Sequence, residues 1–381
     1  MPFPPLTPGA SSRFPPPRVL RLDGGVVSTN DASTIEASIR SLLGQPLSNG
    51  VEWGRLWVVV SGSTDGSDEV VRSLQARDPR IHLVVEPVRR GKARALRRIL
   101  DLSEADLVVM LNADAQAGPG ALRKLLEAGR SLPWPFAVMA RPVTPSLPSG
   151  TLPDSIQWLW YLHHRLHELS LSTGEGNHLS DELLLVSHSP SVELPGQVIN
   201  DGAYIGARLR HEGGQLRYIP QAEVLIQVPW SIGDLLRQRT RIRLGHTQIR
   251  EMTGQRPTTM PQYAFHHPRE VLQWFREAPP EIRSRERALL LLMVVELLAS
   301  VRAWWERGHP RHDPVVWPRL GTVPGARLVG LLQPVEGDGG ELEPARFDGR
   351  AKASRSPFAT PDAVVPPKAH HLEVGPQRQE E

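Results

Sequence analysis

The stretch that decides the fold reads LWVVVSGSTDG, residues 56–66: a short apolar run followed by a small polar loop rich in glycine. Such a run, bounded by turn residues, is typical of a buried strand. Residues 26–27 lead in the same way into Ser-Thr-Asn-Asp at 28–31, and residues 107–111 lead into Asn-Ala-Asp at 112–114. Helical patterns lie between these runs, so they predict βαβ units and a parallel sheet. The polar loops would gather at its carboxyl edge, where open α/β sheets bind ligands.

Composition narrows the class of protein. The chain has 381 residues, 40% of them hydrophobic, which is ample for a large core. A net charge of +3 does not indicate a nucleic-acid partner. The chain has no cysteine, which excludes a disulfide framework and a thiolate metal site.

Two loop residues are candidates for ligand contacts. Asp114 directly follows a buried-type strand, where a carboxylate can hold a divalent cation that bridges a substrate diphosphate. The alternative is a turn or helix-capping aspartate. Ser61 stands at the tip of another strand, whereas Asp65 precedes a helix and fits a structural cap better.

A strongly basic helix is predicted over residues 91–100, and Gly91-Lys92 opens it. A cation is unfavourable at a helix N-terminus, which favours a role for Lys92 in binding an anion such as a diphosphate. The alternative is a solvated basic face, because Arg94, Arg97 and Arg98 follow.

Four segments in order carry a family resemblance: residues 27–31, 59–67, 91–97 and 112–114. In this order and spacing they resemble the motifs of a family 2 glycosyltransferase of the GT-A fold, in the superfamily of cellulose-synthase-like and dolichol-phosphate-mannose-synthase-like enzymes. The resemblance covers about residues 26–317. It implies an α/β fold with a mainly parallel central sheet flanked by helices.

The second half supplies further family positions. Asn200-Asp201-Gly202 matches the acidic position that the family uses as catalytic base, which makes Asp201 the base candidate; its alternative role is a helix N-cap. Residues 238–242 resemble the Q-x-x-R-W motif, with Ile242 in place of Trp. Gln238 and Arg241 lie three apart on one helical face, so both could reach the donor. We expect the neighbouring Arg237, Arg239 and Arg243 to be solvated or lipid-facing.

The resemblance implies donor or nucleotide contacts at Ser28, Asn30, Asp31, Ser61, Lys92, Asn112, Gln238 and Arg241. It implies a Mg²⁺ or Mn²⁺ ion at Asp114. Ser61 and Asn112 stand where the family usually has aspartates, so Asp114 would be the single carboxylate of the metal motif.

Acceptor contacts are predicted at His163, His164 and Glu175, because residues 158–164 and 174–175 resemble a bacterial subgroup. Packing is the alternative for the histidines, and a second base is the alternative for Glu175. His163 and His167 are four apart on one helix, which permits metal ligation. No third ligand is evident, so we do not predict a zinc site.

These observations predict a metal-dependent inverting glycosyltransferase. It would move a sugar, hexosyltransferase-like, from a nucleoside-diphosphate sugar to a glycan or lipid acceptor in bacterial cell-envelope polysaccharide synthesis. We expect a cytoplasmic protein, peripheral at the inner face of the cell membrane. A catalytically degenerate partner at the membrane surface is the alternative, motivated by Ser61, Asn112 and the apolar, Trp-rich residues 289–305. A nucleotidyltransferase is disfavoured because 28–31 lacks a G-x-G-x-R loop.

We expect four parts in the chain: composition indicates the two ends, and the family resemblance implies the domain between them. Residues 1–20 form a Pro-rich disordered lead-in, and residues 21–250 form the GT-A domain, with a donor half at 21–145 and an acceptor half at 146–250. Residues 251–323 form a helical extension, in which 281–305 is one helix or two. Residues 324–381 form a disordered tail rich in Gly, Pro and charge.

Overall fold

The computed structural model describes residues 19–188, 194–309 and 315–316. The predicted disordered segments at 1–20 and 324–381 lie outside the described residues, apart from residues 19 and 20. All described residues belong to one contact unit, Met1–Phe347.

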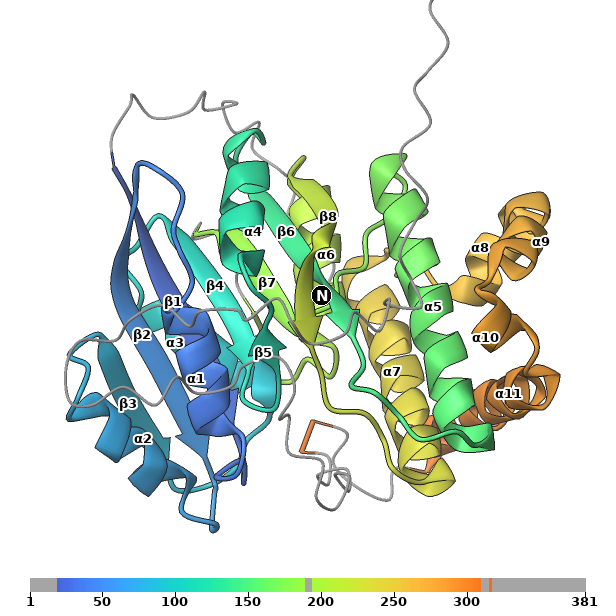
Figure 1. Ribbon diagram of the computed structural model, residues 1–381, viewed down its shortest axis with the longest axis horizontal. Coiled ribbons are helices and arrows are strands. Elements are labelled where there is room, and N and C mark those ends of the chain that lie inside the picture. Colours follow the sequence, from blue (N-terminus) through green and yellow to red (C-terminus); the bar gives the residue numbers. More distant parts are fainter. Residues whose placement is uncertain (1–18, 189–193, 310–314, 317–381) are drawn as a thin grey trace, which may run out of the picture. The chain divides into compact units, whose positions relative to one another are not determined.

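One eight-stranded sheet organises the described part of the chain, with strand order β3-β2-β1-β4-β7-β6-β8-β5 (Figure 1). Neighbouring strands are parallel in β1–β2, β2–β3, β1–β4 and β6–β8, and antiparallel in the pairs that involve β7 or β5. The expected mainly parallel sheet is therefore confirmed. The strands are β1 (Leu20–Ser28), β2 (Val51–Ser61), β3 (Ile81–Glu86), β4 (Leu107–Asn112), β5 (Gln116–Ala117), β6 (Phe136–Val143), β7 (Leu183–Ser187) and β8 (Gln215–Leu225).

Helices cover both faces of this sheet. Apolar stripes of α1, α2 and α4 enter one core cluster, and those of α3 and α6 enter the cluster on the opposite face. The helices are α1 (Ile35–Leu43), α2 (Ser67–Gln75), α3 (Lys92–Leu102), α4 (Ala121–Arg130), α5 (Thr151–Ser172), α6 (Asp201–His211), α7 (Ile232–Thr253), α8 (Met260–His266), α9 (Pro268–Glu277), α10 (Pro280–Arg283) and α11 (Glu286–Gly308).

The antiparallel strand β7 has a consequence for function. Its first residue, Leu183, pairs with Leu111 near the end of β4. The residues just before β7 therefore lie at the carboxyl edge of the sheet, where the Asn112 backbone N–H donates a hydrogen bond to the Glu182 carbonyl oxygen at 3.2 Å. A segment from the second half of the chain thus joins the loops of the first half.

The C-terminal helix α11 packs on α7 and α5 (Figure 1). Its buried stripe consists of small and branched residues: Ala288, Leu292, Val295, Ala299 and Ala303. Between the helices, Glu296 of α11 forms ion pairs with Arg239 and with Arg243 of α7, the second at 2.7 Å. These two arginines therefore join helices together, which corrects the expectation that they are solvated or lipid-facing.

Candidate active site

The tips of three neighbouring parallel strands form one edge of the site. Register places Val27 of β1 beside Asn112 of β4, and Ser28 beside Val60 of β2. Ser28, Ser61 and Asn112, predicted from separate motifs, are thus brought to the same edge. We call this region the donor edge: the loops at residues 28–31, 61–66 and 112–114.

The loops of the donor edge brace one another through hydrogen bonds. Asn30 has a positive φ of 57°, and its side-chain oxygen accepts a hydrogen bond from the Thr64 backbone N–H at 2.7 Å. The Asp65 carboxylate accepts from the backbone N–H of Ala32 at 2.9 Å and from that of Ser67 at 3.1 Å. Asp65 therefore joins two loops and supports the start of α2, which agrees with its structural interpretation.

Three residues predicted to contact the nucleotide sugar, Ser28, Asp31 and Ser61, are engaged in internal hydrogen bonds. The buried Asp31 carboxylate accepts from the Ser28 hydroxyl at 3.0 Å and from the Thr29 backbone N–H at 2.9 Å. The buried Ser61 hydroxyl donates to the Glu86 carboxylate at 2.7 Å. These bonds shape the loops, and nucleotide contact by Ser28, Asp31 and Ser61 stays a prediction.

Asp114 lies half-buried just beyond β4. Within residues 19–188, 194–309 and 315–316, no three His, Cys, Asp or Glu side chains form a group that could hold a metal ion alone. A single carboxylate completed by waters and substrate phosphate oxygens is nevertheless an arrangement that Mg²⁺ accepts. The Asp114 carboxylate is therefore chemically suited to a divalent cation that binds together with a diphosphate.

A second region assembles charged groups from distant segments. Lys92 at the start of α3 forms an ion pair with Asp181, and its Nζ lies 3.3 Å from Asp201 Oδ2. The Lys92 ammonium group thus bridges the two carboxyl groups, and Asp201 Oδ2 has no hydrogen-bond partner among the described residues. Helix α6 begins at Asp201, but its N-cap is Asn200, whose side chain accepts from the Ala203 backbone N–H at 3.1 Å. Asp201 is therefore not the capping residue. We call Lys92, Asp181, Glu182 and Asp201 the acidic cluster.

Burial and charge shift the pKa values of the acidic cluster in different directions. Burial, and then the negative charge of Asp181, raise the pKa of Asp201 to about 7. Burial and the same neighbour also raise the pKa of Glu182 to about 7. Burial, the largest single effect, would raise the pKa of Asp181 too, but the charges of Lys92 and Arg241 and the polar contacts of the carboxylate together hold that pKa well below the usual range. The pKa of Lys92 is raised, because the two aspartates outweigh its desolvation.

Helix α7 closes the site near Asp201. The Arg241 guanidinium donates to the Ile199 carbonyl oxygen at 3.2 Å. Its positive charge contributes to the lowered pKa of Asp181 and partly opposes the rise in the pKa of Asp201. Gln238 lies one turn earlier on the same helix. Close approach of α7 depends on Gly245, because a Cβ at that position would lie 2.8 Å from the Asn200 Cβ. The structure thus brings Arg241 to the acidic cluster.

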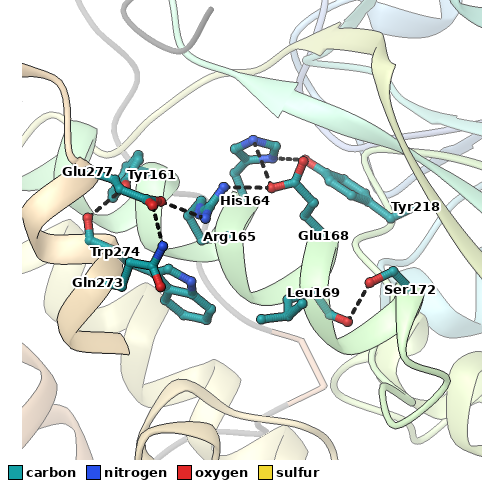
Figure 2. A network of polar contacts seen from close by, with 10 residues as sticks. All are labelled: Tyr161, His164, Arg165, Glu168, Leu169, Ser172, Tyr218, Gln273, Trp274 and Glu277. Atoms are coloured by element: carbon teal, nitrogen blue, oxygen red, sulfur yellow. Dashed lines mark hydrogen bonds and ion pairs between the residues drawn. The ribbon is translucent and has the colours of Figure 1, made fainter. Parts of the chain in front are cut away.

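The predicted acceptor residues His163, His164 and Glu175 have different partners. His164 belongs to a network that links α5 to β8 and α9: its Nδ1 lies 2.8 Å from the Tyr218 hydroxyl, and Arg165 pairs with Glu168 and Glu277, each at 3.0 Å (Figure 2). His163 contacts the next turn of α5, where its Nε2 lies 3.0 Å from His167 Nε2. The exposed Glu175 lies 3.4 Å from His267 and outside the acidic cluster.

His163 belongs to a chain of imidazoles in edge-to-face contact. The His167 ring contacts His178 at 5.3 Å between centroids, and His178 contacts His246 of α7 at 4.8 Å. Burial lowers the pKa of all four imidazoles, so they are neutral at pH 7. These side chains, which come from α5, from α7 and from the loop that contains His178, are therefore polar but uncharged.

Asp181 and Glu182 are the residues that sequence reasoning missed. Their signal was an acidic pair directly before the apolar run 183–186. The pair became recognisable as part of the site only once β7 was found antiparallel to β4.

Comparison with known proteins agrees with this architecture. Residues 25–167 match the family described as Glycosyl transferase family 2. No curated protein matches the chain. Among solved structures, the mannosyltransferase PcManGT from Pyrobaculum calidifontis, in complex with GDP-Man and Mn²⁺, is 19% identical with a TM-score of 0.50, and the match covers 79% of each chain. Residues 1–349 of TarS from S. aureus are 10% identical with a TM-score of 0.42, covering 77% of this chain and 93% of that one.

The family match spans β1 to α5 and contains the donor edge and Lys92. The likeness to PcManGT extends the shared fold into the second half of the chain, which carries Asp201. Residues 25–167 therefore form a glycosyltransferase family 2 domain, and the chain shares the GT-A fold of a glycosyltransferase of known structure.

Proposed function

We propose that this glycosyltransferase is inverting and metal-dependent, with Asp201 as the general base. The observation that carries the proposal is the position of the Asp201 carboxyl group, buried beside Lys92 and within the field of Arg241. A carboxyl group with a pKa of about 7 accepts a proton efficiently near neutral pH.

The reaction follows from these positions. Asp201 removes the proton from an acceptor hydroxyl as that oxygen bonds to the sugar carbon, and the bond between that carbon and the donor diphosphate breaks. Arg241 offsets the negative charge that develops on the diphosphate. Asp114 would hold Mg²⁺ or Mn²⁺, which supplies a further positive charge to the diphosphate when bound.

The donor we propose is a nucleoside-diphosphate sugar. Support comes from the family match and from PcManGT, whose structure contains GDP-Man and Mn²⁺. The acceptor would be a glycan or lipid hydroxyl that contacts His163, His164 or Glu175. The neutral imidazoles near His163 suit an uncharged polyol better than an anion, because each offers one donor and one acceptor.

A thermal-shift panel tests donor and metal together. UDP-, GDP- and ADP-sugars are added with and without Mn²⁺, and one of them should raise the melting temperature only when the metal is present. Stabilisation without metal dependence would remove the role of Asp114. Absence of stabilisation by every donor would favour the non-catalytic alternative.

We also propose that α11 rests on a membrane surface. This helix is the one that is long and apolar enough to cross a bilayer among the described residues, yet Glu296 and its buried stripe pack on α7 and α5. A second stripe is exposed, with Met293 62%, Leu297 64% and Trp304 77% accessible. A helix with one packed face and one exposed apolar face fits contact in the plane of the interface.

Charge supports an anionic bilayer as the partner. Residues 232–309 contain thirteen arginines against eight carboxylates. Flotation with phosphatidylglycerol-containing liposomes should recover the protein, and Leu297→Glu should reduce recovery several-fold without changing donor stabilisation. Ser73→Glu, which adds the same charge at an exposed position of α2, is the control. Equal recovery of Leu297→Glu and wild type would show that the exposed stripe of α11 does not contact the membrane.

A further inference from the structure

The loop before β7 is held against the start of α6 by close backbone contacts. A Cβ at Gly202 would lie 2.4 Å from the Leu179 carbonyl oxygen and 3.2 Å from the Asp181 Cβ. A Cβ at Gly206, one turn later, would lie 2.3 Å from the Asn177 carbonyl oxygen. The two glycines therefore form a smooth strip on α6 that receives residues 177–181 and places Asp181 beside Asp201.

Lys92 completes this arrangement from the other half of the chain. Its ammonium group is paired with Asp181 and lies 3.3 Å from Asp201 Oδ2. The side chain of Asp201 is 4% exposed, whereas that of Asp181 is 25% exposed. The cation and the less buried carboxylate thus surround the more buried carboxyl group.

Charged groups reach the two aspartates from several elements. Lys92 of α3 and Arg241 of α7 face both, and each aspartate faces the other. Asp181 also faces Glu182 at the start of β7 and His178 of its own loop. Lys92 bridges the two carboxyl groups, and the buried Asp201 Oδ2 has no hydrogen-bond partner among the described residues, so Asp181 is the acceptor held beside it.

We propose that Asp181 is a positioning residue for Asp201: anchored by Lys92, it accepts a hydrogen bond from the protonated Asp201 carboxyl group and orients it toward the acceptor. Between turnovers Asp201 carries the proton that it took from an acceptor, and Asp181 holds this protonated form. Lys92 then acts as the internal counter-ion of the pair. The proposal rests on the role of Asp201 proposed above.

The test exploits two opposite shifts. Asp181→Asn removes a negative neighbour and a hydrogen-bond acceptor, so the acidic limb of kcat/KM, which reports the free-enzyme base, should move down by about one pH unit or more. Lys92→Met removes the cation, so the same limb should move up. Asp154→Asn is the matched control, because Asp154 is a buried aspartate paired with Arg285 outside the site, and its limb should not move.

A readout independent of turnover separates this proposal from the one on which it rests. Infrared difference titration follows the carbonyl stretch of the Asp201 carboxyl group, assigned by its loss in Asp201→Asn, in folded variants checked by circular dichroism. Opposite shifts of this band in Asp181→Asn and Lys92→Met would support the proposal. Unshifted titration, or shifts of the same sign, would overturn it, even if Asp201→Asn abolishes transfer. If Asp201→Asn retains transfer, the base assignment fails instead.

Discussion

The donor edge and the acidic cluster use polar side chains in opposite ways. At the donor edge, Asn30, Asp31 and Asp65 are within three dozen residues of their partners and hydrogen-bond mainly to backbone and hydroxyl groups. In the acidic cluster, Lys92 and Asp201 come from segments 109 residues apart and meet as charges.

The difference shows that the two regions depend on different interactions: hydrogen bonding in one and charge in the other. Hydrogen bonds at the donor edge define the shape of the loops, which is the surface that we propose for the nucleotide. The acidic cluster instead places unlike charges in a desolvated space, where their mutual effects are strong. Substitutions should therefore affect binding and loop stability in the first region, and proton transfer in the second.

The largest effect is expected for Asp201→Asn. The amide cannot accept the acceptor proton, so kcat should fall by about 10²- to 10⁴-fold while donor stabilisation persists. Steady-state transfer assays and thermal shifts measure the two quantities. Loss of donor binding instead would mean that Asp201 contacts the donor, which would contradict the division between a binding region and a proton-transfer region.

The next effect is expected for Asp114→Asn at the donor edge. Removing the single carboxylate of the predicted metal position should weaken Mn²⁺-dependent donor binding by about 10- to 100-fold, as for losses around other metal ligands. Donor titration with and without Mn²⁺, followed by calorimetry, measures this change. Unchanged affinity would mean that the metal is held elsewhere.

Gly202→Ala tests how the acidic cluster is assembled. The added methyl group would meet the Leu179 carbonyl oxygen, so the loop must shift, at a cost of about 1–3 kcal/mol in unfolding free energy together with a fall in kcat. Gly233→Ala is the control, because its nearest atom would be 3.8 Å away. Urea unfolding and transfer assays should separate the two variants, and identical behaviour would contradict the packing argument.

The smallest effect is expected for Asn30→Ala. Loss of the bond to Thr64 and the strain of a positive φ should cost about 1–2 kcal/mol of unfolding free energy. Asn30→Gly should cost less, because glycine adopts positive φ freely. If Asn30→Ala keeps its stability but loses donor affinity, the main role of Asn30 is to contact the ligand and not to stabilise the loop.

Much of the fold could be predicted because its signals are local. The run at 56–66 and its two counterparts became β1, β2 and β4 with their loops, and the α6 start at Asp201 was visible in the 200–202 motif. The partners of Arg239 and Arg243 were not predictable, because the carboxylate they share, Glu296, lies more than fifty residues away.

The resemblance located Asp201, but nothing local connected it to Asp181. That contact needs β7 to run antiparallel to β4, and a strand's direction in a sheet depends on its neighbours. It also needs the backbone approach that Gly202 permits. Which face of α11 is buried could not be predicted from sequence for a similar reason. Both of its stripes are apolar, and only packing against other helices decides which one is covered.

The sequence by itself determined the strand-and-loop alternation, the polar chemistry of the donor edge and the identity of the base candidate. These depend on side-chain periodicity and turn preference, which act over a few residues. Tertiary structure alone decided that Lys92 and Asp181 surround Asp201 and that its carboxyl group has a pKa of about 7. Desolvation and charge pairing act through space, so these properties exist only once distant segments are packed together.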